Sequence, residues 1–151
     1  MRIDSHVAKV TKLNALRARL DPDADFEIWF WATMTLGTHA VNAALHHCGA
    51  TAEDDAFATQ PGVYLVSGPG GALESAFRPL GDVLHVGRPK VDAPVPSDVA
   101  DMMQAMEVIE HHRDPCIRGE REPTPAIARE CDQAVARVLA LLQTRLGRPN
   151  P

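Results

Sequence analysis

Cysteine, lysine and tyrosine are scarce in this chain of 151 residues. The three cysteines are an odd set without C-x-x-C spacing, which argues against a secreted disulfide framework and favours buried thiols in a reducing compartment. Lysine accounts for three of the 15 basic residues, and the 20 acidic residues bring the net charge to −5. We therefore expect no general electrostatic attraction to nucleic acid or to an anionic membrane, and a nucleotide partner would need a local basic patch.

The chain also lacks a long apolar run. Its most apolar region, residues 26–45, is interrupted by Glu27, His39 and Asn42. A signal peptide or a membrane span needs an uninterrupted stretch, so we expect a cytoplasmic protein without a membrane partner. The composition, 45% hydrophobic and 23% charged, is typical of one soluble domain, which we expect to cover residues 1–151.

Four segments carry apolar residues three or four positions apart, the spacing of amphipathic helices. We expect these helices to span residues 4–20, 22–48, 98–113 and 125–146, followed by a frayed tail at 148–151. Asp21, Ser97 and Thr124 are residue types that cap helix N-termini, and a proline follows the first and the last of them. The second helix has apolar side chains around most of its circumference, so it should be the central and most buried one.

Residues 50–96 interrupt the helical pattern. Residues 63–66 have strand-forming side chains, the glycine-rich residues 67–71 signal a turn, and residues 72–77 can return as a second strand. Prolines between residues 87 and 96 then favour an extended arm along the surface. The predicted fold is mainly α: a four-helix bundle with an inserted β-hairpin and an extended arm between the second and third helices.

A polar stripe runs along the otherwise apolar second helix. Its members recur three or four residues apart and are Thr35, Thr38, His39, Asn42 and His46. If the stripe faces the core, it lines a polar pocket for a small ligand, a metal or ordered water. If it faces outward, it is the solvated side of a half-buried helix, and Thr and Asn are ordinary surface residues. The sequence leaves this orientation open and favours the outward one.

The histidines raise the question of a metal site. Six of the seven are His39, His46, His47, His85, His111 and His112. However, the chain has no H-E-x-x-H motif, and the Glu-x-x-His pattern fails because Arg113 follows Glu110 at that spacing. His111 and His112 are better explained as residues that the helix dipole favours at a C-terminus. Local spacing therefore predicts no metal site and no cofactor.

Basic residues gather around the end of the hairpin and the start of the arm. Arg78, His85 and Arg88 have side chains that together bind phosphate and move protons. A structural interpretation of the same residues pairs Arg78 with an acidic neighbour such as Asp82, and uses His85 and Arg88 to anchor the arm to the bundle. The chain has no G-x-S-x-G motif, and its glycine-rich turn lacks the Lys-Ser/Thr of a phosphate-binding loop.

With six residues between Arg78 and His85, this pair resembles the Arg-x4–6-His signature of the HEPN helical-bundle family. Members of that family are compact, often dimeric proteins of four to five helices. They include metal-independent RNases and nucleotide-binding partners of toxin systems. The resemblance implies that Arg78 would contact a phosphate or a transition state and that His85 would act as an acid or base.

Our main functional expectation is a binding or interaction module that associates with a second copy of itself, because a small hairpin is marginally stable alone. The candidate interface residues are Trp29, Trp31, Tyr64 and Phe77. One alternative is a HEPN-like RNase or nucleotide-binding protein that uses Arg78 and His85.

A second alternative is a small-ligand or metal pocket on the second helix. The candidate ligand-binding residues for this pocket are His39, Asn42 and His46, with Arg88 as a further one.

Overall fold

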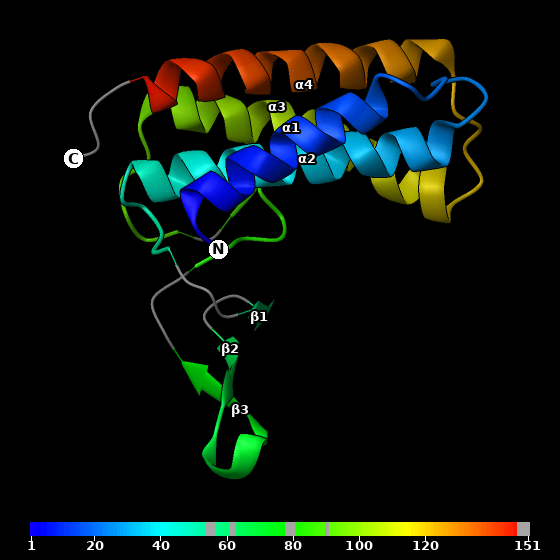
Figure 1. Ribbon diagram of the computed structural model, residues 1–151. Helices are drawn as coiled ribbons and strands as arrows, with labels where there is room; N and C mark the ends of the chain where they lie inside the picture. Colours follow the sequence, from blue (N-terminus) through cyan, green and yellow to red (C-terminus); the bar gives the residue numbers. More distant parts are fainter. Residues whose placement is uncertain (54–56, 61–62, 78–80, 90, 148–151) are drawn as a thin grey trace.

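The computed structural model describes residues 1–53, 57–60, 63–77, 81–89 and 91–147. It confirms the mainly α fold and the four predicted helices, which are α1 (Ile3–Arg17), α2 (Phe26–His47), α3 (Ser97–Arg113) and α4 (Pro125–Leu146) (Figure 1). Among the described residues, none of the helices combines the length and the apolar character that crossing a membrane would need.

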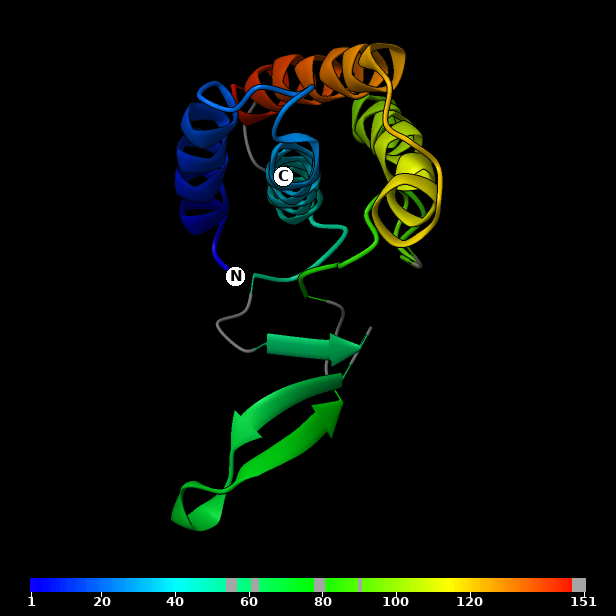
Figure 2. The ribbon, with the colours of Figure 1, turned by 90° about the vertical axis from the view of Figure 1, so that its right-hand side faces the viewer.

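Helix α2 is the centre of the structure, as its composition predicts. Viewed along the helices, it lies in the middle, with α1, α4 and α3 around it (Figure 2). Phe30, Leu36 and Leu45 of α2 have no solvent exposure. Trp29 is only 3% exposed and belongs to the core, so its predicted role in a self-association interface is wrong. Trp31 is half-buried, and the side chains of Tyr64 and Phe77 lie outside the described part of the chain.

The side of α2 that the helices leave open is covered by residues 81–87, which follow the hairpin. Val83 and Val86 are buried in the same apolar core as α2 and α3. At Gly87 the backbone passes so close to α3 that a Cβ atom there would lie 2.9 Å from the backbone of Glu107. The Gly87 amide donates to the Glu110 carboxylate at 3.1 Å. Residues 81–86, for which the sequence predicted no element, are thus part of the core. The described residues of the predicted arm, 87–89 and 91–96, contain no helix, as expected.

Several helix ends differ from the expected ones. Helix α1 runs from Ile3 to Arg17 and ends three residues before the expected Leu20. Helix α2 begins at Phe26 because the Asp21 carboxylate accepts the backbone N–H of Asp23, at 2.9 Å, and closes a turn before the helix starts. Helical structure does not end at Asp114-Pro115 as expected. Directly after α3 it continues as one π-helical turn, η2 (Asp114–Arg118). Proline is tolerated there because the first turn of a helix does not use its own N–H groups.

The caps are confirmed in one of three cases. The Thr124 hydroxyl accepts the backbone N–H of Ile127 and caps α4. Ser97 is the first residue of α3 rather than its cap, and the preceding residue is Pro96. The predicted frayed tail, residues 148–151, lies outside the described residues.

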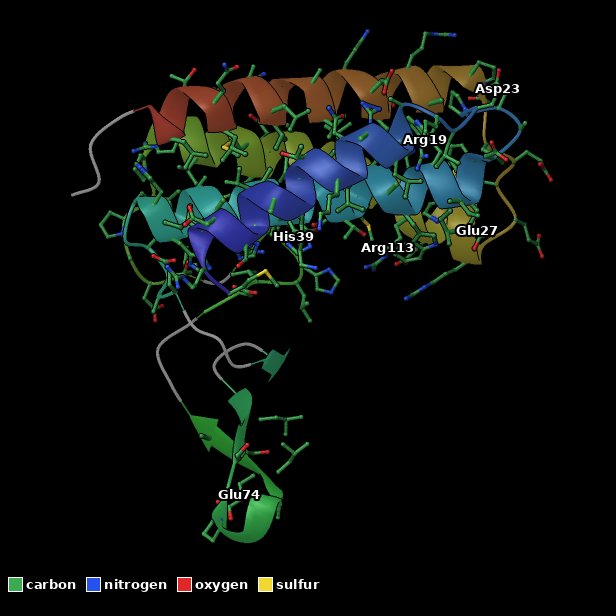
Figure 3. The ribbon with its side chains drawn as sticks, viewed as in Figure 1. Arg19, Asp23, Glu27, His39, Glu74 and Arg113 are labelled. Carbon is green, nitrogen blue, oxygen red and sulfur yellow. The ribbon has the colours of Figure 1, made fainter. Side chains whose placement is uncertain are left out.

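The insertion contains the predicted hairpin and one strand more. Strands β1 (Phe57–Gln60), β2 (Val63–Ser67) and β3 (Leu73–Phe77) form an antiparallel sheet in the order β1-β2-β3. The turn between β2 and β3 is a 3-10 helix, η1 (Pro69–Gly71), in which Gly70 and Gly71 have φ of 73° and 79°. The sheet stands away from the helices, and Glu74 lies near its far end (Figures 1 and 3).

The cysteines are only partly buried, against our expectation of three buried thiols. Cys131 is fully buried in the core, and burial raises the pKa of its thiol to about 12. Cys48 and Cys116 are half-buried, and all three are free thiols.

We predict that Gly87→Ala lowers the free energy of unfolding by about 1–3 kcal/mol, because the new methyl group forces the 81–87 segment away from the backbone of α3. Urea unfolding measures this change. Gly147→Ala is the matched control, since a Cβ atom there meets only ordinary contacts at 3.6 Å. Equal stability of the two variants would contradict the close packing of this segment.

Candidate functional site

The polar stripe of α2 faces the interior, so the outward orientation that the sequence favoured is wrong. Asn42 is 1% exposed and His46 is 5% exposed, while His39 is half-buried. Asn42 and His46 contact Val83 and Asp82 of the covering segment, whereas His39 contacts His6 of α1. The stripe is therefore a set of polar groups that the fold must satisfy with partners.

Asn42 holds the backbone of the covering segment. Its side-chain amide donates to the Val83 carbonyl at 2.8 Å, and its carbonyl accepts the Val83 N–H at 2.7 Å. A third bond, of 2.9 Å, runs from the amide to the carbonyl of Thr38. The predicted ligand-binding residue Asn42 thus has its hydrogen-bonding groups occupied by the protein itself, and its role is to fix the residue next to Asp82.

Asp82 is the centre of the site. A single oxygen, Oδ1, lies 3.1 Å from His6 Nε2 and 3.0 Å from His46 Nε2. The nitrogen of Met1 lies 2.6 Å from the same atom. Burial raises the pKa of this carboxyl group, but hydrogen bonds from His46 and His6 outweigh it and hold the pKa well below its usual range. Asp82 is therefore an ionised carboxylate at neutral pH.

His6 is a member of the site that our sequence analysis missed. It comes from α1 and is 1% exposed. It lies four residues before Val10 and seven before Leu13, which belong to the apolar face of α1 that packs on the core. A histidine that shares the buried face of a helix was the signal available in the sequence.

The other ring nitrogens of the two buried histidines are also held. His46 Nδ1 lies 2.7 Å from the hydroxyl oxygen of Thr51, and His6 Nδ1 lies 2.9 Å from Nδ1 of His39. Because the Asp82 carboxylate can only accept, the two Nε2 atoms donate to it. While the two rings are neutral, each Nδ1 atom then accepts, from the Thr51 hydroxyl in His46 and from His39 Nδ1 in His6.

His39 lies on α2, on the side that α1 crosses (Figure 3). Burial, together with the charges of His6 and Lys9, lowers the pKa of His39 to about 4. A neutral His39 carries one ring proton and one free lone pair, so it can either donate to His6 or accept from it.

Three ligand atoms of this cluster lie close enough together to hold one metal ion. His6, His46 and Asp82 each offer one ligand atom, and the three atoms lie within 4.8 Å of one another. Ligands bound tetrahedrally at about 2.0–2.2 Å to one Zn²⁺ ion lie about 3.3–3.6 Å apart. The two Nε2–Oδ1 distances, 3.1 and 3.0 Å, are slightly shorter, so the side chains would move apart by a few tenths of an ångström to take an ion. Our expectation of no metal site came from local spacing, and a site built from three separate segments has no such spacing.

The remaining predicted residues do not join this cluster. Arg88 is exposed and forms an ion pair with Glu107 of α3, which agrees with the anchoring role that we considered for it. His85 is exposed, and its charge acts on Asp114 at the end of α3. Arg78 lies outside the described residues, so its pairing with His85 or with Asp82 stays a prediction. His112, near the end of α3, contacts Glu130 of α4 at 2.9 Å.

Comparisons with protein-family models, with curated proteins and with solved structures find no match for this chain.

We predict that the metal-free protein loses stability as the pH falls from 6.5 to 4. The folded state lowers the pKa of His39 from 6.5 to about 4, so the unfolded chain binds more protons in this window. We expect a loss of about 1–2 kcal/mol, smaller than for a fully buried group because solvent screens this half-exposed ring. The contribution of Asp82 lies in a separate window, since its pKa is depressed from 3.8 and its stabilisation is lost only at more acidic pH.

Urea unfolding at several pH values measures this slope. His39→Gln should flatten it, because the amide still donates to His6 and does not titrate. The control His111→Gln, at an exposed position of α3, should keep it. A steep slope in His39→Gln would show that other groups cause the pH dependence.

We further predict that Asn42→Leu lowers the free energy of unfolding by about 2–4 kcal/mol, because it leaves the Val83 N–H and carbonyl without partners in the core. Thr38→Val is the comparison, since the Thr38 hydroxyl bonds only to the Met34 carbonyl within α2. If the two variants lose the same stability, Asn42 does not hold the covering segment.

Proposed function

We propose that this protein binds a divalent transition-metal ion such as Zn²⁺ through His6 Nε2, His46 Nε2 and Asp82 Oδ1. The observation that carries the proposal is the convergence of these three ligand atoms from α1, from α2 and from the segment after the sheet. Sequence positions 6, 46 and 82 meet at one point although nothing in the local sequence links them. This is the metal alternative of the α2 pocket, with His6 and Asp82 as ligands in place of His39 and Asn42.

The surroundings of the ligands support the proposal. Histidines that bind metals almost always make a hydrogen bond through their second ring nitrogen, and that bond orients the ring. His46 has Thr51 in this position and His6 has His39. A hydroxyl group and a neutral imidazole can each accept as well as donate. The Nε2 atoms can therefore exchange a proton for a metal while the same partners continue to hold the Nδ1 atoms.

The ligand types favour transition metals over Mg²⁺ and Ca²⁺. Two imidazole nitrogens and one carboxylate oxygen suit Zn²⁺, Fe²⁺ and related ions, whereas Mg²⁺ and Ca²⁺ prefer sites made of oxygen ligands. Both histidine side chains are almost fully buried, and Asp82 is 25% exposed. An ion would therefore enter from the side of Asp82.

We predict that the chain binds one Zn²⁺ per molecule and that Asp82→Asn lowers the affinity by a hundredfold or more. Loss of a residue that only hydrogen-bonds to a ligand lowers metal affinity about 10–100-fold, so loss of a ligand should cost at least as much. Competition with a chromogenic chelator measures the affinity, and absorption of the Co²⁺ form reports the ligand set. His46→Asn should have the same effect. Circular dichroism of each variant establishes that the helices remain folded.

His85→Ala and His47→Ala are the matched controls. His85 is exposed on the same segment as Asp82, and His47 is a buried neighbour of His46 outside the ligand set. Both should bind Zn²⁺ with the affinity of the unmodified protein. The proposal fails if the unmodified chain binds no transition metal, or if Asp82→Asn binds Zn²⁺ as tightly as the two controls.

A further inference from the structure

We propose that metal occupancy of this cluster controls how firmly the projecting sheet, β1–β3, is attached to the helical body. This inference rests on the proposed metal binding and adds a conformational consequence to it. It follows from two observations. Both connections of the sheet contact the helical body at the cluster, and the described residues of the sheet pack little against the helices.

Both connections of the sheet meet the helical body at the cluster. On the connection that enters the sheet, Thr51 contacts His46 at 2.7 Å, and the Glu53 carboxylate accepts the backbone N–H of Ile3 at 2.8 Å. On the connection that leaves the sheet, Asp82 contacts His6 and His46. The ligand set and its immediate partners thus include residues from both ends of the insertion.

Among the described residues, the sheet makes no extensive contacts of its own with the helices. Its strands pair with one another in the order β1-β2-β3, and both views show it standing clear of the four helices (Figures 1 and 2). A small sheet that packs against no helix depends on its connections for its orientation. The fastening of residues 51–53 and 81–83 to the helical body therefore contributes to how firmly the sheet is attached.

A bound ion would cross-link three elements that now meet through hydrogen bonds. His6 belongs to α1, His46 to α2 and Asp82 to the connection that leaves the sheet. The Asp82 carboxylate is 25% exposed, so water can compete for it when the site holds no metal. Because a ligand that prefers one state shifts the population toward it, Zn²⁺ would favour the state in which Asp82 stays docked.

The same coupling has a reciprocal form. If Zn²⁺ strengthens the attachment of the sheet, a change that weakens the attachment must lower the affinity for Zn²⁺ by the same factor. Glu53 is a suitable position for such a change, because it fastens the entering connection to Ile3 and is not a ligand.

Nuclear magnetic relaxation of backbone amides in the full chain tests this directly. We expect that Zn²⁺ raises the transverse relaxation rates of β2 and β3 toward those of α4, because the sheet then tumbles with the helices. We also expect amide exchange of Val83 to slow by about tenfold. The helix α4 is the internal reference, since none of the three ligands lies on it.

Two variants complete the test. Asp82→Asn should abolish both effects of Zn²⁺, whereas Asp92→Asn, the same change farther along the same connection, should keep them. Glu53→Ala should weaken Zn²⁺ binding by about two- to fivefold, and Glu120→Ala, at an exposed position between α3 and α4, should leave it unchanged.

The outcomes separate the two proposals. If the chain binds no Zn²⁺, the proposed function fails and this inference fails with it. If Zn²⁺ binds, and Asp82→Asn abolishes binding, but the relaxation rates of β2 and β3 and the exchange of Val83 do not change, the metal site stands and the coupling is overturned. Unchanged Zn²⁺ affinity in Glu53→Ala would likewise overturn the coupling.

Discussion

The hydrogen bonds between the Asp82 carboxylate and two buried imidazoles are the constraint on which the rest of this fold depends. Helix α2 carries buried polar side chains on a face that contacts His6 of α1 and residues 82–83. Buried polar groups without partners destabilise a protein by several kcal/mol. A connection that returns from the sheet supplies those partners with one carboxylate and one backbone peptide. For that reason, residues 81–87 form part of the core although they have no regular secondary structure.

This arrangement explains why the bundle is open on one side. Three helices surround α2, and the fourth side takes a segment of irregular backbone (Figure 2). A fourth surrounding helix could offer only side chains to His46 and Asn42, since its own peptide groups are already bonded. An irregular segment has free peptide groups, and Val83 uses both of its own with Asn42. The polar face of α2 therefore requires a partner with free peptide groups, and residues 81–87 provide one.

Sequence reasoning predicted the elements that local signals define. The four helices follow from apolar spacing, and the β2–β3 hairpin follows from strand-forming residues on both sides of a glycine-rich turn. Strand β1 has only four residues and depends on pairing with β2, a contact that no local pattern specifies. Trp29 was misjudged because a large aromatic residue suits a core as well as an interface.

The candidate site was predicted only in the part that lies on one helix. The spacing of His39, Asn42 and His46 placed them on one face of α2, because helix geometry fixes that relation. It could not show which way the face points, since that depends on what covers it. Asp82 had no signal at all: it is an ordinary acidic residue between Gly81 and Val83 until the chain folds back across α2. Sites assembled from distant segments are set by tertiary packing, which a local pattern does not contain.

Asn42 and Asp82 fasten the same segment to α2 by contacts of different chemistry. The amide of Asn42 does not titrate, and both of its polar atoms are bonded to the backbone of Val83. Its bonds to Val83 do not themselves involve an ion, and an ion that keeps Asp82 docked would make their opening rarer. Asp82, the adjacent residue, is charged, partly exposed and shared between two histidines, so protons, water and metal ions can all compete for it. The Asn42 contact is therefore insensitive to protons and metal ions, whereas the Asp82 contact responds to both. The protonation or metal occupancy of the cluster can then change while Asn42 keeps the segment in the core.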